Sequence, residues 1–254
     1  MRPAPRTPPS FGPARAALLL ETVLPACLLL ACGSAPEGTS PAPAEPAHTP
    51  GCQAPASVSN QPHTIDETVA LINALPKPLS LPCFVEALGR PLQLNAARSS
   101  TSAQPAVGDR SPRIFVKLDT LTLSVVPAGV GAPLLEMGEA RPGLRSLKGE
   151  LEFPILQVLP PSAAYDHASY DGTITKCAFC HAGEAPESFA WGGRGFVSQA
   201  LRPYHSQQVP LVSVEAEAAS CDPALEAERC AMLHALFGWG PSLGWDFPAE
   251  LDQF

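Results

Sequence analysis

Two cysteines and a histidine stand close together in the last third of the chain, in the sequence Cys177-Ala178-Phe179-Cys180-His181. This is the C-x-x-C-H spacing at which two thiols add across the two vinyl groups of a haem. The histidine that follows then lies beside the iron and serves as its proximal ligand. The sequence therefore predicts one covalent haem c, held by Cys177, Cys180 and His181.

Two other interpretations of the same residues stay open. In an exported protein, Cys177 and Cys180 can form a disulfide or a redox-active pair, with His181 as a bystander. Cysteines at this spacing also bind zinc together with ligands from elsewhere in a chain.

The motif resembles the haem-attachment site of the cytochromes c, and the resemblance covers the motif and, loosely, the sequence up to the last predicted helix. It implies a second axial ligand, for which Met232 and His205 are the candidates. Residues 189–196, rich in aromatics and glycine, provide either an apolar wall for the haem or ordinary core. In those cytochromes a helix leads into the motif, whereas residues 171–175 have a turn and a β-like stretch. This departure predicts a haem site within a different fold.

Residues 1–31 have the features of an export signal. Arg2, Arg6 and Arg15 precede an apolar run that is too short to span a bilayer. The run ends in the sequence LLAC at residues 29–32, which resembles the lipobox of bacterial lipoproteins. The resemblance implies cleavage before Cys32, lipidation of Cys32, and a place at the outer membrane, on its periplasmic face or at the cell surface. An ordinary cleaved signal peptide with an uninvolved cysteine is the alternative.

Composition limits both the organisation and the function. Residues 32–62 are rich in Pro, Ala, Ser, Gly and Thr without apolar periodicity, so we expect a lipid-anchored tether there. Residues 63–254 are long enough for a single globular domain. The chain has 16 Lys and Arg against 24 Asp and Glu, a net charge of −8, which argues against nucleic acid as a partner. It has no phosphate loop, G-x-S-x-G or H-E-x-x-H sequence, so we expect an electron-transfer or binding protein rather than an enzyme.

The apolar pattern predicts an α+β fold. We expect a small antiparallel sheet with a packed helix in residues 63–160, followed by a loop-rich, partly helical lobe in residues 161–254 that bears the C-x-x-C-H motif. A capping box at Thr64 opens the first helix and Pro76 ends it. Further elements are predicted as a helix over 81–88, strands over 90–97, 113–118, 121–126, 134–137, 147–153 and 211–215, an irregular stretch over 158–170, and a last helix that ends near 237.

Four further cysteines of the mature chain are disulfide candidates: Cys52, Cys83, Cys221 and Cys230. They allow three pairings, and the sequence-local choice is Cys52–Cys83 with Cys221–Cys230. A continuous helix from residue 222 would place the Cα atoms of the second pair about 13 Å apart, too far for a disulfide. Either that helix begins later, near Glu228, or these cysteines pair elsewhere; we expect the later start.

Two functions from different classes fit these observations. The first is a lipid-anchored periplasmic protein that binds haem c, a single-haem electron carrier with a periplasmic redox partner. The alternative is a non-enzymatic, disulfide-stapled envelope lipoprotein that binds a partner or a ligand.

Overall fold

The structure, a computed structural model, describes residues 49, 51–98, 102 and 104–254. These residues fall in one compact unit. The predicted signal, the lipobox and Cys32 lie outside the described residues.

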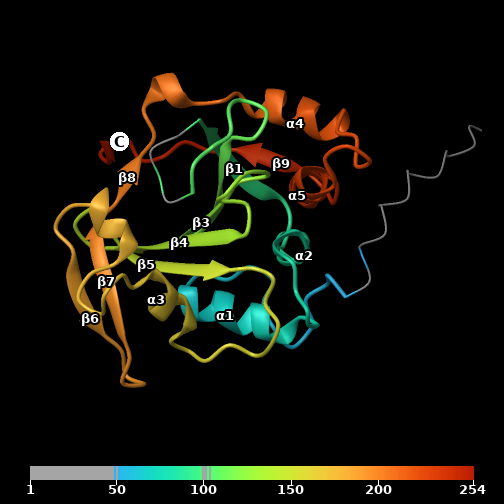
Figure 1. Cartoon of the computed structure of the whole chain (residues 1–254). Helices are drawn as coiled ribbons and strands as arrows, with labels where there is room; N and C mark the ends of the chain where they lie inside the picture. The colour runs from blue at the N-terminus through green and yellow to red at the C-terminus, as the bar shows by residue number, and fades with distance from the viewer. Residues whose placement is uncertain (1–48, 50, 99–101, 103) are drawn as a thin grey trace, which may run out of the picture. The chain divides into compact units, whose positions relative to one another are not determined.

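The fold is α+β and centres on one large, mostly antiparallel sheet of eight strands, in the order β6-β7-β5-β4-β3-β2-β1-β9 (Figure 1). β9 runs parallel to β1, and the other neighbouring strands are antiparallel. A separate pair, β8 with β10, is parallel. The strands are β1 (Leu92–Ala97), β2 (Arg113–Leu118), β3 (Leu121–Val125), β4 (Leu134–Arg141), β5 (Arg145–Glu152), β6 (Ala185–Ser188), β7 (Arg194–Gln199), β8 (Leu201–Arg202), β9 (Ser242–Gly244) and β10 (Asp252–Gln253).

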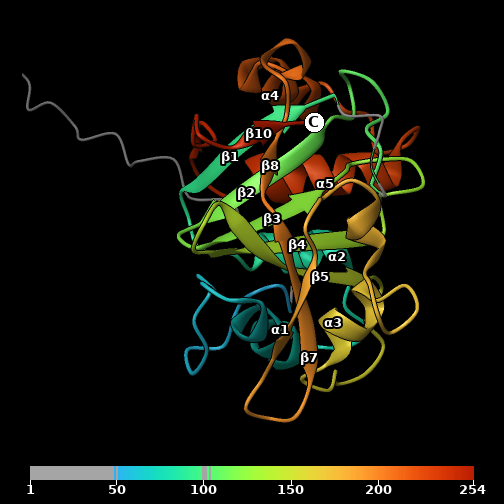
Figure 2. The same ribbon diagram turned by 90° about the vertical axis from the view of Figure 1, so that its left-hand side faces the viewer.

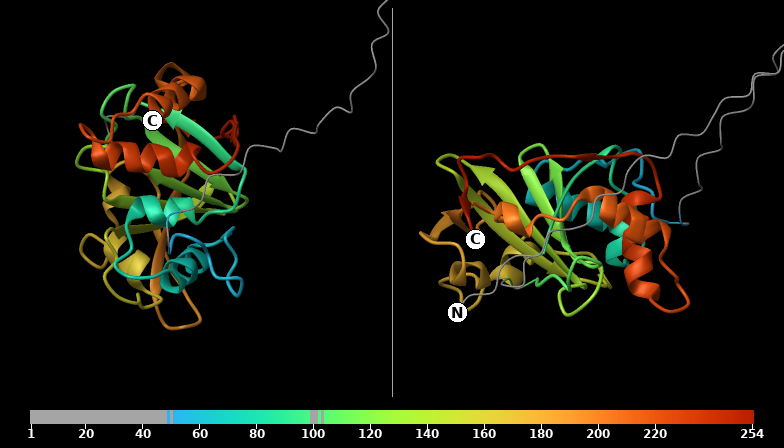
Figure 3. Two further views of the ribbon diagram at one scale, coloured as in Figure 1. Left: turned by 90° about the vertical axis from the view of Figure 1, so that its right-hand side faces the viewer. Right: turned by 90° about the horizontal axis from the view of Figure 1, so that it is seen from above.

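Helices cover one face of this sheet. The left view of Figure 3 shows α5, α2 and α1 side by side in front of the strands. The helices are α1 (Ile65–Ala74), α2 (Leu81–Glu86), α3 (Ala163–Ala168), α4 (Leu211–Ala219) and α5 (Ala227–Phe237), with two 3-10 turns, η1 (Lys176–Phe179) and η2 (His205–Gln207).

Local sequence signals explain where the first helix and the first hairpin form. The Thr64 side chain accepts a hydrogen bond from the Glu67 amide at 3.1 Å, and the Glu67 carboxylate accepts one from the amide of His63 at 2.6 Å. These bonds satisfy amides that the first helical turn leaves free. Between β2 and β3, Asp119 adopts a positive φ of 53°, as a two-residue hairpin loop requires. The N-cap at Thr64 and the hairpin are both where the sequence predicts them, but the Glu67 carboxylate bonds the amide of His63 and not that of Thr64, so the predicted capping box is only half formed.

The hydrophobic core lies between the helices and the sheet. Side chains alternate between the two faces of a strand, so every second residue of each central strand faces the helices. Most of these positions are apolar and buried: Leu92, Leu94, Ile114, Val116, Leu118, Leu121, Leu123, Val125, Leu135, Met137, Leu147 and Leu151.

The other face of the central strands is polar, and the end of the chain crosses it. Figure 2 shows β8 and β10 passing in front of the strands on this side. Residues 245–254, called the crossing segment below, are held to β1 by two hydrogen bonds. The Trp245 amide donates to the Leu94 carbonyl at 3.1 Å, and the Asn95 side chain donates to the Trp245 carbonyl at 3.0 Å. A polar sheet face is thereby enclosed instead of facing water.

The sheet is larger than the sequence predicts, and the two predicted lobes share it. β7 pairs with β5, and β9 pairs with β1, so residues after 161 form both edges of the sheet. The sequence did not predict β7 as a strand. Its sequence, RGFVSQ, contains a glycine and follows two more, and this composition is typical of a loop. Two smaller predictions were also wrong: residues 158–170 contain α3, and residues 211–215 begin α4.

Contact with the folded unit begins before residue 63. Cys52 is buried and bonded to Cys83, Val58 packs against the core, and the Gly89 amide donates to the Asn60 carbonyl at 2.8 Å. Residues 51–62 are therefore packed against the domain.

Candidate functional site

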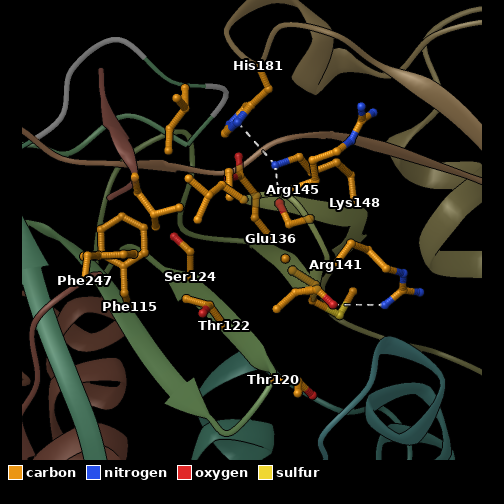
Figure 4. Close-up of a pocket in the computed structure, with 18 of the residues that line it drawn as sticks. Phe115, Thr120, Thr122, Ser124, Glu136, Arg141, Arg145, Lys148, His181 and Phe247 are labelled. Carbon is orange, nitrogen blue, oxygen red and sulfur yellow. Dashed lines mark hydrogen bonds between the residues drawn. The ribbon is translucent and has the colours of Figure 1, made fainter. Parts of the chain in front are cut away.

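A hollow of about 420 Å³ opens on the polar face of the sheet (Figure 4). Its floor consists of side chains from β2 to β5, and the crossing segment contributes Trp245, Phe247 and Leu251 to its wall. Cys177 and His181 of the C-x-x-C-H motif complete the wall beside β5. Two of the three motif side chains therefore reach one cavity.

Buried polar contacts fix the motif against the sheet. The Thr175 hydroxyl accepts from the Cys177 amide at 3.1 Å and donates to the Glu184 carboxylate at 2.5 Å. Lys176 donates to Glu150 of β5 at 2.6 Å, and Glu150 is only 2% exposed. A buried carboxylate requires such partners, because an uncompensated charge in the interior is costly. Glu150 thus anchors the start of the motif on the sheet.

His181 is held in the form that binds metals. Its Nδ1 lies 2.8 Å from the Gln199 carbonyl oxygen, which can only accept a hydrogen bond. Nδ1 therefore carries the proton, and Nε2 keeps a free lone pair. Burial, assisted by the charge of Lys148, lowers the pKa of His181 to about 3, so the imidazole is neutral at physiological pH. Histidines that bind metal ions commonly have their second ring nitrogen bonded to a carbonyl or carboxylate in this way.

The two motif cysteines differ in environment and are not bonded to each other. Cys177 is half-buried and Cys180 is exposed, and both are free thiols. Burial raises the pKa of Cys177 to about 11, so its thiol stays protonated. The interpretation of the motif as a Cys177–Cys180 disulfide is not what the structure shows.

A zinc site is not arranged around the motif either. Among the described residues, the one group of three possible metal ligands within 4.8 Å of one another is Cys221, Glu226 and Cys230. Cys221 and Cys230 are joined in a disulfide, so neither sulfur can bind a metal ion as a thiolate.

Lys148 of β5 is the residue of the hollow that sequence reasoning missed. It is 6% exposed, and its Nζ lies 2.7 Å from the Ser146 hydroxyl and 3.2 Å from His181 Nδ1. Burial lowers the pKa of Lys148 to about 8. The alternation of β5 predicts that Lys148 faces away from the core, but only the structure shows that His181 and the end of β7 lie against it.

Neither candidate for a second axial ligand lies at the hollow. Met232 is 2% exposed in the core on α5, on the helix-covered side of the sheet. His205 is on η2 and does not belong to the residues that line the hollow. The structure thus brings His181 and Cys177 together but places Met232 and His205 elsewhere.

The predicted aromatic wall also lies elsewhere. The rings of Phe189 and Trp191 pack on Tyr165 of α3, with centroids 4.6 Å and 6.0 Å away. Phe189 packs against the hydrophobic core, and neither side chain lines the hollow. Ordinary packing, the alternative interpretation of residues 189–196, describes these two rings.

Both sequence-local disulfides are confirmed. Cys52 pairs with Cys83, and Cys221 pairs with Cys230 at a Cα–Cα distance of 5.5 Å. The second pair is possible because α5 begins only at Ala227, as the disulfide geometry required.

Comparison with protein families, curated proteins and solved structures found no match to this chain. Among the described residues, no helix combines the length and the apolar character needed to cross a membrane. The argument for function therefore rests on the site.

The anchoring cluster predicts a pH dependence of stability. His167 Nδ1 lies 2.8 Å from Glu150 and its Nε2 lies 3.5 Å from Glu152, and the hydrogen bond to Glu150 is the main reason that the pKa of His167 is raised. A raised histidine pKa stabilises the fold fully below the unfolded value near 6.5, and this stabilisation is lost as pH rises through the folded value. We expect the free energy of unfolding to fall by about 1 kcal/mol over that interval.

Thermal unfolding between pH 5.5 and pH 7.5 measures this effect, below the range in which the lowered pKa of Lys148, about 8, makes stability rise with pH. His167→Gln should remove most of the decrease, whereas His63→Gln, at an exposed ion pair, should retain it. An unchanged pH profile in the His167 variant would show that the cluster does not stabilise the protonated form.

Proposed function

We propose that this chain is an exported c-type haem-binding protein and that it carries electrons through a single haem. The observation that supports this most directly is the hydrogen bond from His181 Nδ1 to the Gln199 carbonyl. It leaves Nε2 free in a neutral imidazole, beside a cavity, in the residue that the C-x-x-C-H spacing assigns to the iron.

The residues present fit the group chemically. Cys177 and Cys180 are free thiols, as thioether formation requires, and the exposed Cys180 is accessible to the attachment machinery. The haem would supply a one-electron redox centre whose potential depends on its ligands and on burial. The chain would contribute the thioether bonds, the His181 ligand and the hollow beside it.

Co-expression with a cytochrome c maturation system tests the proposal. The peptide that contains both cysteines should gain about 616 Da, the mass of one haem. The protein should also keep a Soret band after acid-acetone extraction. Protein that has been exposed to the maturation system but still has two free thiols in the motif, with no Soret band, would exclude covalent haem.

The alternative function, a ligand-binding envelope lipoprotein, has its own support. The two disulfides suit an exported protein. The enclosed hollow has a volume within the range of small-molecule sites. This function requires no haem, so the mass measurement separates it from the first.

Lipid anchoring through Cys32 is part of both functions. The sequence LLAC at residues 29–32 is its basis, and multiple acyl chains hold a protein firmly because each buried methylene adds about 0.8 kcal/mol. Cys32→Ala should move the protein from the membrane fraction to the soluble fraction. Cys27→Ala is the matched control and should leave it membrane-bound. A Cys32 variant that keeps both its membrane association and the wild-type mass would contradict the anchor.

A further inference from the structure

The hollow is basic although the whole chain is acidic. Five of its lining side chains are basic and one is acidic, in a chain whose net charge is −8. The basic ones are Arg113, Lys117, Arg141, Arg145 and Lys148, and the acidic one is Glu136. This contrast with the rest of the chain favours an anionic ligand.

Two of these cations already have carboxylate partners. Arg113 forms an ion pair with Glu136. Arg141 lies between Glu139 and Glu187, at 2.5 Å and 2.9 Å. These pairs stabilise the floor of the hollow and contribute little net charge to a ligand.

Lys148 has no such partner. It donates to Ser146 Oγ and, at 3.4 Å, to the Gln199 carbonyl oxygen, whereas His181 Nδ1, 3.2 Å away, carries a proton of its own and cannot accept from it; none of the described residues forms a salt bridge with Lys148. At 6% exposure, it is an ammonium group without a counter-charge. Removing a charge from water costs several kcal/mol unless an opposite charge accompanies it. An anion in the hollow would supply that charge, and Figure 4 shows Lys148 beside His181 at the cavity wall.

On the β2 side, the wall of the hollow is aromatic, and two of the cations lie over its rings: Arg113 over Phe115 at 5.0 Å and Lys117 over Trp245 at 6.0 Å. Phe247 packs edge-on against Phe115 of β2 with ring centroids 5.0 Å apart, and Trp245 lies 4.3 Å from Phe247. The hollow reaches from β2 to β5, about 14 Å at the usual spacing of neighbouring strands. A ligand of that length would contact the lysine at one end and the rings at the other.

We propose that the hollow binds an organic carboxylate with an apolar body, whose carboxylate pairs with Lys148 and whose body lies against Phe115, Trp245 and Phe247. Two sources provide this chemistry: a free small carboxylate, and the carboxylates of a haem attached at Cys177 and Cys180. The second source rests on the proposed function, whereas the first does not.

The test uses 1-pyrenebutyrate as a fluorescent probe of the mature chain, expressed without haem maturation. The probe should bind at least about tenfold tighter than 1-pyrenebutanol, which has the same body without the charge. Lys148→Met should weaken pyrenebutyrate binding at least about tenfold and leave pyrenebutanol unaffected. Methionine has a similar volume without the buried charge, so this variant should fold. Lys77→Met is the matched control. Lys77 donates to backbone carbonyls at the end of α1 and does not line the hollow, so this variant should bind the probe like the wild type.

Equal affinity for the acid and the alcohol, or a Lys148→Met variant that binds the acid normally, would overturn the proposal. Haem-loaded protein separates the two sources. Retained probe binding identifies a free carboxylate as the ligand. Exclusion of the probe, together with a midpoint potential that Lys148→Met shifts, identifies the haem carboxylates. Exclusion without that shift would overturn the role of Lys148 in the loaded protein. The haem-free measurements do not depend on haem attachment, so failure of the proposed function leaves them valid.

Discussion

His181→Ala is expected to reduce the yield of haem-loaded protein at least about tenfold under co-expression with a maturation system. The imidazole is neutral and its Nδ1 proton is bonded to the Gln199 carbonyl, so its lone pair needs no further rearrangement to bind iron. Removal of the ring leaves the iron without its fixed protein ligand, although the thiols of Cys177 and Cys180 remain. The ratio of haem absorbance to protein mass in purified samples measures the yield.

Two control variants distinguish a ligand from a bystander. His205→Ala and Met232→Leu change residues that do not line the hollow, so both should keep the wild-type haem content and spectrum. A spectral change in either variant would show that the haem-loaded protein rearranges to recruit that residue. Wild-type haem content in His181→Ala would exclude His181 as the essential ligand.

The second large effect concerns the disulfides. The Cys52–Cys83 bond closes a loop of 31 residues and the Cys221–Cys230 bond closes one of 9. In the loop-entropy description, a disulfide stabilises more when its loop is longer, because it restricts the unfolded chain more. Replacing both cysteines of the first pair by Ala should lower the free energy of unfolding by about 3.5 kcal/mol, against about 2.5 kcal/mol for the second.

Urea unfolding of the two double variants measures these differences. The Cys52–Cys83 variant should also lose the attachment of residues 51–62 to the domain, and limited proteolysis should detect that loss. Equal destabilisation by the two pairs would mean that local packing, and not loop length, determines their contributions. Alkylation of native wild-type protein at Cys83, Cys221 or Cys230 would contradict the pairing itself.

Local sequence determined the first helix and the central strands, and it offered the disulfide pairing as one choice among three. Thr64, Glu67 and Pro76 mark the ends of α1 through hydrogen bonds and a missing amide, which act within a few residues. The pairing of Cys221 with Cys230 was the sequence-local choice, which a helix from residue 222 would have prevented, and the start of α5 at Ala227 makes it possible. The spacing of Cys177, Cys180 and His181 likewise identified the motif before any fold was known.

Only the tertiary structure decided what surrounds that motif. β7 pairs with β5, between β5 and the edge strand β6, and β9 forms the opposite edge beside β1; these pairings join residues far apart in the sequence, and the composition of β7 and β9 does not predict strands. The alternation of β5 predicts that Lys148 faces away from the core but cannot show that His181 and Gln199 lie against it. The group that fixes the tautomer of His181 is the backbone carbonyl of Gln199. Every residue has such a carbonyl, so the sequence cannot indicate which one bonds His181. The sequence gives only the spacing of the three motif residues. The hollow beside them, its basic side chains and the hydrogen-bond partners of His181 all depend on packing between residues far apart in the sequence.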